Sequence, residues 1–201
     1  LFMHILIRQA TICCPSSAHH GQVRDILISN GIIRSIQEAI SAENAEVIQA
    51  EGLHLSMGWA DLFAHFCDPG LEHRETLESG AHAAAAGGFT DVLLIPNTEP
   101  ALHAKTQVEY ISRCTHPYPV QLHPVGAITR NTAGAELAEM YDMRQSGAVA
   151  FSDGIHPVQS AGLLIKALQY VKAFNGTIIQ IPDDRSIAPH ALMHEGIVST
   201  R

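Results

Sequence analysis

The first 57 residues place apolar and polar positions in short alternating runs, a pattern typical of β-strands. The runs lie at 4–12 (HILIRQATI), 23–31 (VRDILISNG), 31–37 (GIIRSIQ) and 47–56 (VIQAEGLHLS). The second run ends in Asn-Gly, a pair favoured in two-residue hairpin turns. We therefore predict a small antiparallel β unit over residues 1–57.

After Trp59 the pattern changes, because apolar runs now alternate with segments that have helical periodicity. Strands are predicted within 60–66, 89–97, 119–129, 148–154 and 177–184, and helices within 76–88, 104–114, 135–147 and 160–176. Alternation of this kind is typical of a parallel sheet wrapped by helices. We predict an α/β domain over residues 58–201.

Local signals support the predicted helices. Thr76 with Ser79 three residues later forms a weak N-terminal cap, and the Ala-rich segment that follows ends at Gly87-Gly88. In the last helix, one buried face is predicted from three- and four-residue spacing. Its residues are Leu164, Leu168, Val171 and Phe174.

Polar residues gather where the predicted parallel strands end. These ends are His65–Asp68, 96–98, 126–129, 152–154 and 180–184. Neither GxGxxG nor GxxxxGK[ST] follows a strand, which argues against the commonest phosphate-binding sites. Closed β/α barrels keep their active sites at the carboxyl ends of strands, so we expect chemistry there.

Composition and charge narrow the function classes. Twelve Lys and Arg against twenty Asp and Glu give a net charge of -8, and no basic run could neutralise a nucleic-acid backbone. No apolar run approaches the roughly 20 residues that span a bilayer, and no secretion signal is apparent. Four cysteines without CxxC spacing, Cys13, Cys14, Cys67 and Cys114, indicate reduced thiols. We expect a cytoplasmic protein that binds neither nucleic acid nor membrane.

Several motifs in order resemble those of dihydroorotases of the multifunctional-complex type, in the amidohydrolase superfamily. They are GWADLFAHFCDPGLEHRETLESGAHAAAAGGFTDVLLIPNTEPAL, PVGAITRN, GAVAFSDGIHPVQSAGLLIKALQY and MHEGIVSTR. The resemblance implies a (β/α) barrel of the amidohydrolase type, with its first five strands present, and a small N-terminal β-sandwich domain over residues 1–57. It also implies a homo-oligomer.

The resemblance implies hydrolysis of the cyclic amide of dihydroorotate to carbamoyl aspartate in pyrimidine biosynthesis. Family members hold zinc, which acidifies a bound water and polarises the amide carbonyl. Three family positions are retained here: His65 and Asp153 match metal ligands, and Asn97 matches the residue that binds the substrate carboxylate.

Three other family positions have changed type. Phe63 replaces the first histidine of the His-x-His pair, Cys67 replaces the substrate-binding arginine, and Gln180 replaces the histidine of the fifth strand. Residues 61, 63, 65 and 67 would alternate onto one strand face, so we expect the Phe63 ring to fill the metal site. A thiol cannot imitate a bidentate guanidinium. We predict a disrupted metal site, with zinc absent or weakly bound, and an inactive protein.

The sequence leaves enzyme activity open, and three alternatives remain. The protein could be an active zinc-dependent dihydroorotase that binds dihydroorotate and carbamoyl aspartate, or a non-catalytic scaffold for aspartate carbamoyltransferase. Hydantoinases and allantoinases rank last, because they use a carboxylated lysine after the fourth strand and AVAFSDG contains none.

Other side chains admit a second interpretation. His65 and Cys67 could chelate a metal with Asp153, but a buried free cysteine is more often a packing residue. His123 and His156 lie near strand ends at positions that are not ligands in the family, and we expect neither in the site. Asp183-Asp184 is expected to be an acidic loop more than a catalytic carboxylate pair.

The chain ends at GIVSTR, after the fifth predicted strand. The family continues with three more strands, which carry a further ligand histidine and the catalytic aspartate. A five-stranded part of a barrel would leave two open edges. We therefore expect a truncated or incompletely resolved product, or a chain that folds with a partner.

Overall fold

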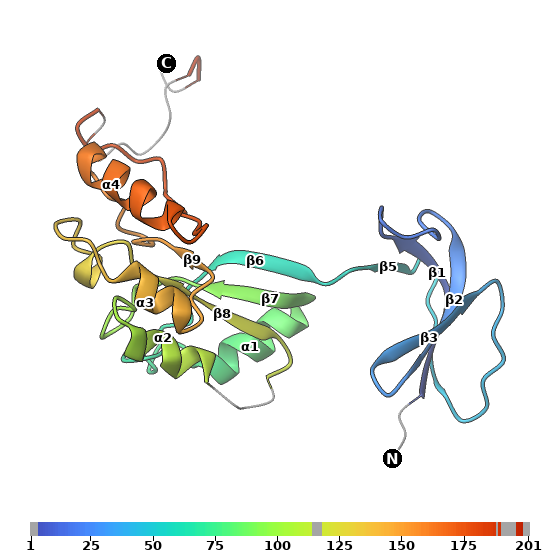
Figure 1. The fold of residues 1–201 in the computed structure, drawn as a ribbon. Helices are drawn as coiled ribbons and strands as arrows, with labels where there is room; N and C mark the ends of the chain where they lie inside the picture. Colours follow the sequence, from blue (N-terminus) through green and yellow to red (C-terminus); the bar gives the residue numbers. More distant parts are fainter. Residues whose placement is uncertain (1–3, 114–117, 188, 190–195, 199–201) are drawn as a thin grey trace. The chain divides into compact units, whose positions relative to one another are not determined.

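The computed structural model describes residues 4–113, 118–187, 189 and 196–198. The chain divides into two units, residues 1–58 and 59–201 (Figure 1). No helix in the described part of the chain is long and apolar enough to cross a bilayer.

One five-stranded sheet forms the first unit. Its strands are β1 (His4–Cys13), β2 (Val23–Ser29), β3 (Ile32–Gln37), β4 (Glu46–Ile48) and β5 (His54–Ser56). The predicted hairpin over β2 and β3 is confirmed, and its turn residues Asn30 and Gly31 have φ of 52° and 74°. The antiparallel prediction is wrong for β4 and β5, which pair parallel to β1. They can do so because long connections, in place of tight turns, return the chain alongside β1.

The core of this sheet is small. Ile7, Ala10, Ile12 and Ile26 form its buried cluster. The described residues of the unit give one sheet, so the second layer of the expected sandwich remains a prediction.

The second unit contains a parallel four-stranded sheet in the order β6-β7-β8-β9, as the strand–helix alternation predicts. Its strands are β6 (Trp59–Ala64), β7 (Phe89–Leu94), β8 (Gln121–Gly126) and β9 (Ala150–Phe151). The helices are α1 (Leu77–Ala86), α2 (Lys105–Ser112), α3 (Met140–Gln145) and α4 (Ala161–Lys172), with a 3-10 turn η1 (Arg130–Thr132). The fifth predicted strand is present only as a parallel bridge between Phe151 and Ile178.

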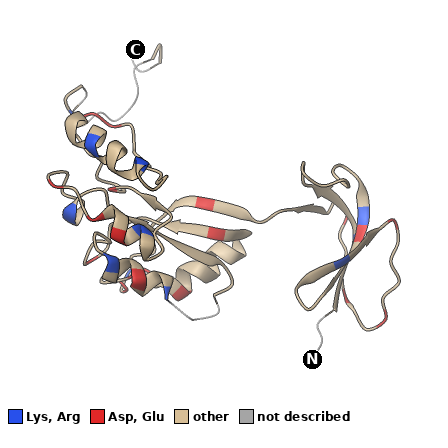
Figure 2. Cartoon of the chain, in the orientation of Figure 1, with Lys and Arg blue, Asp and Glu red and all other residues tan. Residues whose placement is uncertain are grey.

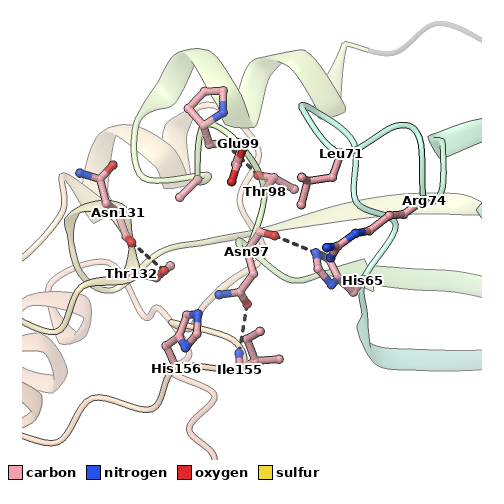
Figure 3. Close-up of a pocket in the computed structure, with 12 residues that line it drawn as sticks. His65, Leu71, Arg74, Asn97, Thr98, Glu99, Asn131, Thr132, Ile155 and His156 are labelled. Atoms are coloured by element: carbon pink, nitrogen blue, oxygen red, sulfur yellow. Dashed lines mark hydrogen bonds between the residues drawn. The ribbon is translucent and has the colours of Figure 1, made fainter.

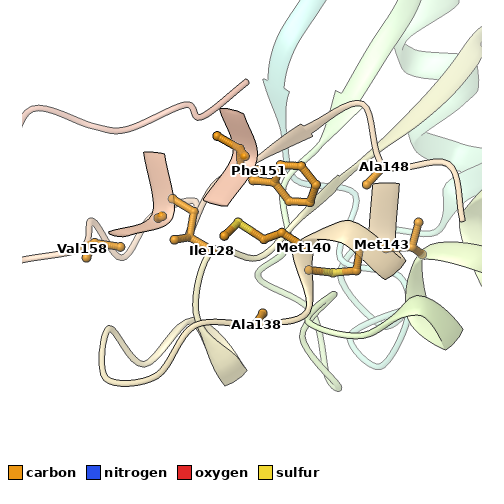
Figure 4. Packing of buried hydrophobic residues seen from close by; sticks show 10 residues of the cluster. Ile128, Ala138, Met140, Met143, Ala148, Phe151 and Val158 are labelled. Carbon is orange, nitrogen blue, oxygen red and sulfur yellow. The ribbon is translucent and has the colours of Figure 1, made fainter. Parts of the chain in front are cut away.

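Two apolar clusters hold the helices on this sheet. Helix α1 packs on β7 and α2 on β8, around buried residues that include Leu77, Val92 and Leu102. The second cluster surrounds Phe151, which is fully buried between residues of α3, α4 and the end of β8 (Figure 4). This cluster fixes the end of β9.

The helix ends mostly agree with the sequence signals. Thr76 and Ser79 form a reciprocal capping box, a stronger cap than predicted, and α1 ends before Gly88, whose φ is 84°. Helix α3 covers only part of the predicted segment.

The predicted buried face of α4 needs one correction. Leu168 is 49% exposed, and Ala167 is fully buried in its place. The buried face of α4 runs through Ala167, Val171 and Phe174. These residues are three or four positions apart, close to the 3.6 residues of one helical turn, and Leu168 lies beside that face.

Candidate functional site

The end of β6 differs from the predicted metal strand. The strand stops at Ala64, its register with β7 is irregular between Asp61 and Ala64, and Cys67 has a left-handed φ of 63°. The prediction that residues 61, 63, 65 and 67 share one strand face is therefore wrong.

Phe63 is partly exposed in the described part of the chain. Its side chain is 37% exposed and belongs to none of the apolar clusters formed by described residues. The backbone N–H of Phe63 donates to Oδ1 of Asp61 at 2.9 Å, which turns the chain locally. The expectation that the Phe63 ring fills the metal site stays a prediction.

Cys67 is buried, and its Sγ lies 3.8 Å from the backbone oxygen of His65, to which it donates. The two residues lie beyond the strand, so they lack the shared strand face on which a His-x-Cys chelate was considered. Cys13, Cys14 and Cys67 are free thiols, as predicted, and Cys114 lies outside the described residues.

His65 makes a hydrogen bond that fixes its ring. Its Nε2 lies 2.7 Å from the backbone oxygen of Asn97. Because a carbonyl oxygen only accepts, Nε2 carries the hydrogen and has no lone pair for a metal. In the neutral ring, the remaining acceptor is Nδ1.

The Asn97 side chain joins the ends of β7 and β9. Its Nδ2 donates to the backbone oxygen of Asp153 at 3.1 Å, and its Oδ1 accepts from the N–H of Ile155 at 3.0 Å. Gly154 lies between them with a φ of 59°, and a Cβ there would come within 1.7 Å of Oδ1. The predicted substrate residue thus has both ends of its amide engaged in the fold.

Asp153 is 1% exposed and anchors the end of β8. Its Oδ1 accepts from the N–H groups of Ile128 and Thr129, both at 2.9 Å, and its Oδ2 accepts from the Thr129 hydroxyl at 2.5 Å. Burial raises the pKa of Asp153, while the hydrogen bonds from Thr129 and Ile128 oppose that rise. Three of the roughly four acceptor positions of a carboxylate are therefore used.

Gln180 also bonds to the protein. Its Oε1 accepts from the N–H of Val158 at 3.4 Å, and its Nε2 donates to the oxygen of Val158 at 3.3 Å. The amide thus pairs with the backbone as a neighbouring strand would. Val158 belongs to the buried cluster around Phe151.

A cavity of about 430 Å³ lies at the carboxyl ends of the strands, and we call it the strand-end pocket (Figure 3). It is lined by His65, Leu71, Arg74, Asn97, Thr98, Glu99, Pro100, Ala101, Asn131, Thr132, Ile155 and His156. The pocket brings together two of the predicted residues, His65 and Asn97. Asp153, Phe63, Cys67 and Gln180 are not part of its lining.

Sequence reasoning missed several lining residues. His156 was expected to stay outside the site, yet it lines the pocket, and Arg74 and Glu99 were not considered. Their position in the loops that follow β6, β7 and β9 is a signal that could have identified them, because such loops form the carboxyl end of a parallel sheet.

Two other predicted features lie elsewhere. His123 bonds through Nε2 to Oδ1 of Asp91 at 2.8 Å on the sheet, and this hydrogen bond lowers the pKa of Asp91. Asp184 accepts from Ser186 and Asp183 pairs with Arg185 at 3.8 Å, as expected of an acidic loop.

The described residues do not by themselves form a complete zinc centre. Protein zinc sites usually have three or more protein ligands. Within the described residues, no group of three His, Cys, Asp or Glu side chains is placed to hold a metal ion. His65 keeps only Nδ1 as an acceptor, and the fold already uses three acceptor positions of the Asp153 carboxylate.

The model of a family described as dihydro-orotase-like matches residues 53–201. A dihydroorotase from Pelotomaculum thermopropionicum is 39% identical over 198 residues, which cover 98% of this chain and 46% of that protein. A dihydroorotase from Geobacter sulfurreducens is 39% identical over 200 residues, with 98% and 47% covered. The chain therefore spans about half the length of the curated relatives it matches.

Solved structures share the fold. An L-hydantoinase (dihydropyrimidinase) from Arthrobacter aurescens has a TM-score of 0.72 at 23% identity, covering 93% of this chain and 42% of its own. A dihydroorotase structure has a TM-score of 0.63 at 12% identity, with 87% and 50% covered. At these identities the likeness concerns the fold alone, and it agrees with the partial parallel sheet of the second unit.

Proposed function

Because the chain belongs to the dihydro-orotase-like family, we propose that it acts in pyrimidine biosynthesis as a dihydroorotase-fold protein without zinc-assisted hydrolysis. Its role is then to bind and not to convert. The relatives named dihydroorotase support the pathway and the cyclic-amide chemistry of the fold.

One observation carries the proposal. The two retained residues that match metal ligands are both bonded to the protein itself: His65 donates from Nε2 to Asn97, and Asp153 accepts three hydrogen bonds. Only Nδ1 of His65 and one acceptor position of the Asp153 carboxylate remain for a metal, which is fewer than the three protein ligands that a zinc site usually has. A metal site at these residues is therefore disfavoured by the small number of remaining donor atoms as well as by the missing ligand types.

The test is the metal content and turnover of the purified protein. We expect substoichiometric zinc by elemental analysis and no interconversion of dihydroorotate and carbamoyl aspartate. Stoichiometric zinc with turnover would instead establish the active enzyme.

Adding histidines at positions 63 and 180 is a second test of the proposal that the protein lacks zinc-assisted hydrolysis. The double substitution Phe63→His/Gln180→His supplies imidazoles at both positions. We expect it to remain without stoichiometric zinc, because positions 63 and 180 lie outside the lining of the pocket that contains His65. Recovery of a zinc equivalent would show that only the ligands had been lost.

An assembly role, such as a scaffold for aspartate carbamoyltransferase or a homo-oligomer, is a second candidate. It is favoured by the exposed apolar side chains of β6: Trp59 is 63% and Leu62 is 60% exposed, and among the described residues β6 pairs only with β7. Co-purification with the carbamoyltransferase, weakened by Leu62→Ser, is the expected result. A lone protein unaffected by that substitution would remove this candidate.

A further inference from the structure

The polar side chains of the strand-end pocket are of two kinds. Some are already bonded within the protein, since Asn97 joins β7 to β9 and the hydroxyls of Thr98 and Thr132 donate to the backbone oxygens of Pro100 and Asn131. These side chains shape the wall of the pocket. The two hydroxyls have used their hydrogens and can only accept from a ligand.

The second kind has no such bonds. Within the described residues, neither a hydrogen bond nor an ion pair holds the side chains of Arg74, Glu99 or Asn131, and none joins Arg74 to Glu99. Arg74 follows β6 and Glu99 follows β7, so the two opposite charges reach the pocket from different loops (Figure 3). Each is free to meet a ligand.

We propose that Arg74 is the anion anchor of this pocket, in place of the arginine that position 67 lacks, and that Glu99 selects carboxylates that also carry N–H donors. The inference rests on the proposed function, since it assigns binding without turnover to the same site. The guanidinium offers a planar fork that matches a carboxylate, whereas the Glu99 carboxylate only accepts. Asn131 can donate and accept.

The charges explain the selectivity. The chain as a whole is acidic, with a net charge of -8, and Lys and Arg are scattered among Asp and Glu along the elements (Figure 2). A simple dicarboxylate therefore gains one ion pair at Arg74 and meets repulsion at Glu99. A ureido or amide nitrogen on the ligand converts that repulsion into a hydrogen bond.

The space suits a small extended molecule. The pocket of about 430 Å³ adjoins a second cavity of about 270 Å³, and Thr132 and His156 line both. The first volume alone lies within the range of roughly 300–1,000 Å³ that is usual for small-molecule sites. Arg185, at the second cavity, already has a carboxylate partner in Asp183, so Arg74 is the stronger anchor.

Calorimetric titration of the purified protein in a chelating buffer tests the assignment. The probes are carbamoyl aspartate and succinate, which has the same two carboxylates without the ureido group. We expect carbamoyl aspartate to saturate the protein, and Arg74→Gln to weaken its binding roughly tenfold or more, as for loss of a charge-assisted hydrogen bond. Arg74→Lys should give an intermediate loss, because it keeps the charge without the fork.

Two further variants complete the design. Arg113→Gln is the matched control, since Arg113 is an exposed arginine paired with Glu109 outside the pocket, and it should leave binding unchanged. Glu99→Gln should bring the affinities for carbamoyl aspartate and succinate closer together. Thermal unfolding midpoints check that each variant folds.

The outcomes separate the two proposals. Absence of saturable carbamoyl aspartate binding at millimolar concentrations, or equal affinities of the wild type and a folded Arg74→Gln variant, overturns the anchor role. An unchanged preference in Glu99→Gln overturns the selectivity role. Zinc-dependent turnover in a parallel assay overturns only the proposed function, because Arg74 could still anchor the carboxylate.

Discussion

The two outer strands of the parallel sheet, β6 and β9, differ in how strongly the fold constrains them. In β9, Phe151 is fully buried and the following Asp153 is 1% exposed with three hydrogen bonds. In β6, Trp59 is 63% and Phe63 is 37% exposed. The comparison shows that burial and hydrogen bonds constrain the end of β9, whereas the described neighbours of β6 leave Trp59 and Phe63 exposed.

The three residues that match family positions are also held by hydrogen bonds. His65, Asn97 and Asp153 each hold the ends of strands together through hydrogen bonds. Each of the three residues therefore has a structural role. Substitutions on the two strands therefore measure the difference directly.

The largest expected difference is between two phenylalanines. Phe151→Ala should lower the free energy of unfolding by about 3–5 kcal/mol, because it empties the core around α3 and α4. Phe63→Ala should cost less than about 1 kcal/mol, as is usual for exposed side chains. Equilibrium unfolding in urea measures both, and similar losses for the two variants would contradict the comparison.

Asp153→Ala should lower the free energy of unfolding by about 3 kcal/mol, because three buried donors lose their acceptor. Those donors are two N–H groups, of Ile128 and Thr129, and the Thr129 hydroxyl. Asp184→Ala is the control, since Asp184 is exposed and bonds to Ser186 locally, and it should change stability by about 0.5 kcal/mol or less. An Asp153→Ala variant as stable as this control would refute the anchoring role.

Gly154→Ala should cost about 2 kcal/mol or more, because it adds a Cβ at a left-handed position against Asn97. Adding Asn97→Ala to this variant removes the oxygen that the Cβ meets at 1.7 Å. The double variant should then lose less than the two single losses combined. Strict additivity in urea unfolding would show that the two residues do not interact.

The smallest effect concerns Asp91 on β7, next to β6. The hydrogen bond from His123 is the main cause that lowers the pKa of Asp91 below its usual 3.8. A lowered folded-state pKa gives stability that is present above 3.8 and lost as the pH falls through the lowered value. The thermal midpoint of the wild type should fall as the pH drops below 3.8. Asp91→Asn should remove the contribution of Asp91 to this fall, and His123→Gln should reduce that contribution. An unchanged acid profile in both variants would exclude the pair as its source.

Periodicity predicted the order of the second unit well. A parallel sheet is buried on both faces, so its strands are apolar runs that alternate with helical segments. This alternation can be read from a single sequence. Thr76 and Gly87-Gly88 marked the ends of α1 because caps act through neighbouring backbone groups. The parallel pairing of β4 and β5 with β1 was not predictable, since it depends on contacts between distant segments.

The candidate site was predicted less well, for a similar reason. Strand alternation placed Phe63 inside, but an irregular register between Asp61 and Ala64 is a property of pairing with β7 and not of β6 alone. Likewise, the partners that occupy His65 and Asp153 come from other strand ends. Arg74 and Glu99 line the pocket because two loops meet in the fold, which the sequence of either loop does not indicate.

The reciprocal bonds of Gln180 with Val158 have a consequence for the segment that follows α4. In the described residues this segment meets the sheet through the bridge between Phe151 and Ile178, and the Gln180 amide adds a further link to the domain. An imidazole at that position could not donate and accept along one backbone unit as a primary amide does. The glutamine side chain therefore stabilises a segment whose own backbone makes few contacts with the sheet.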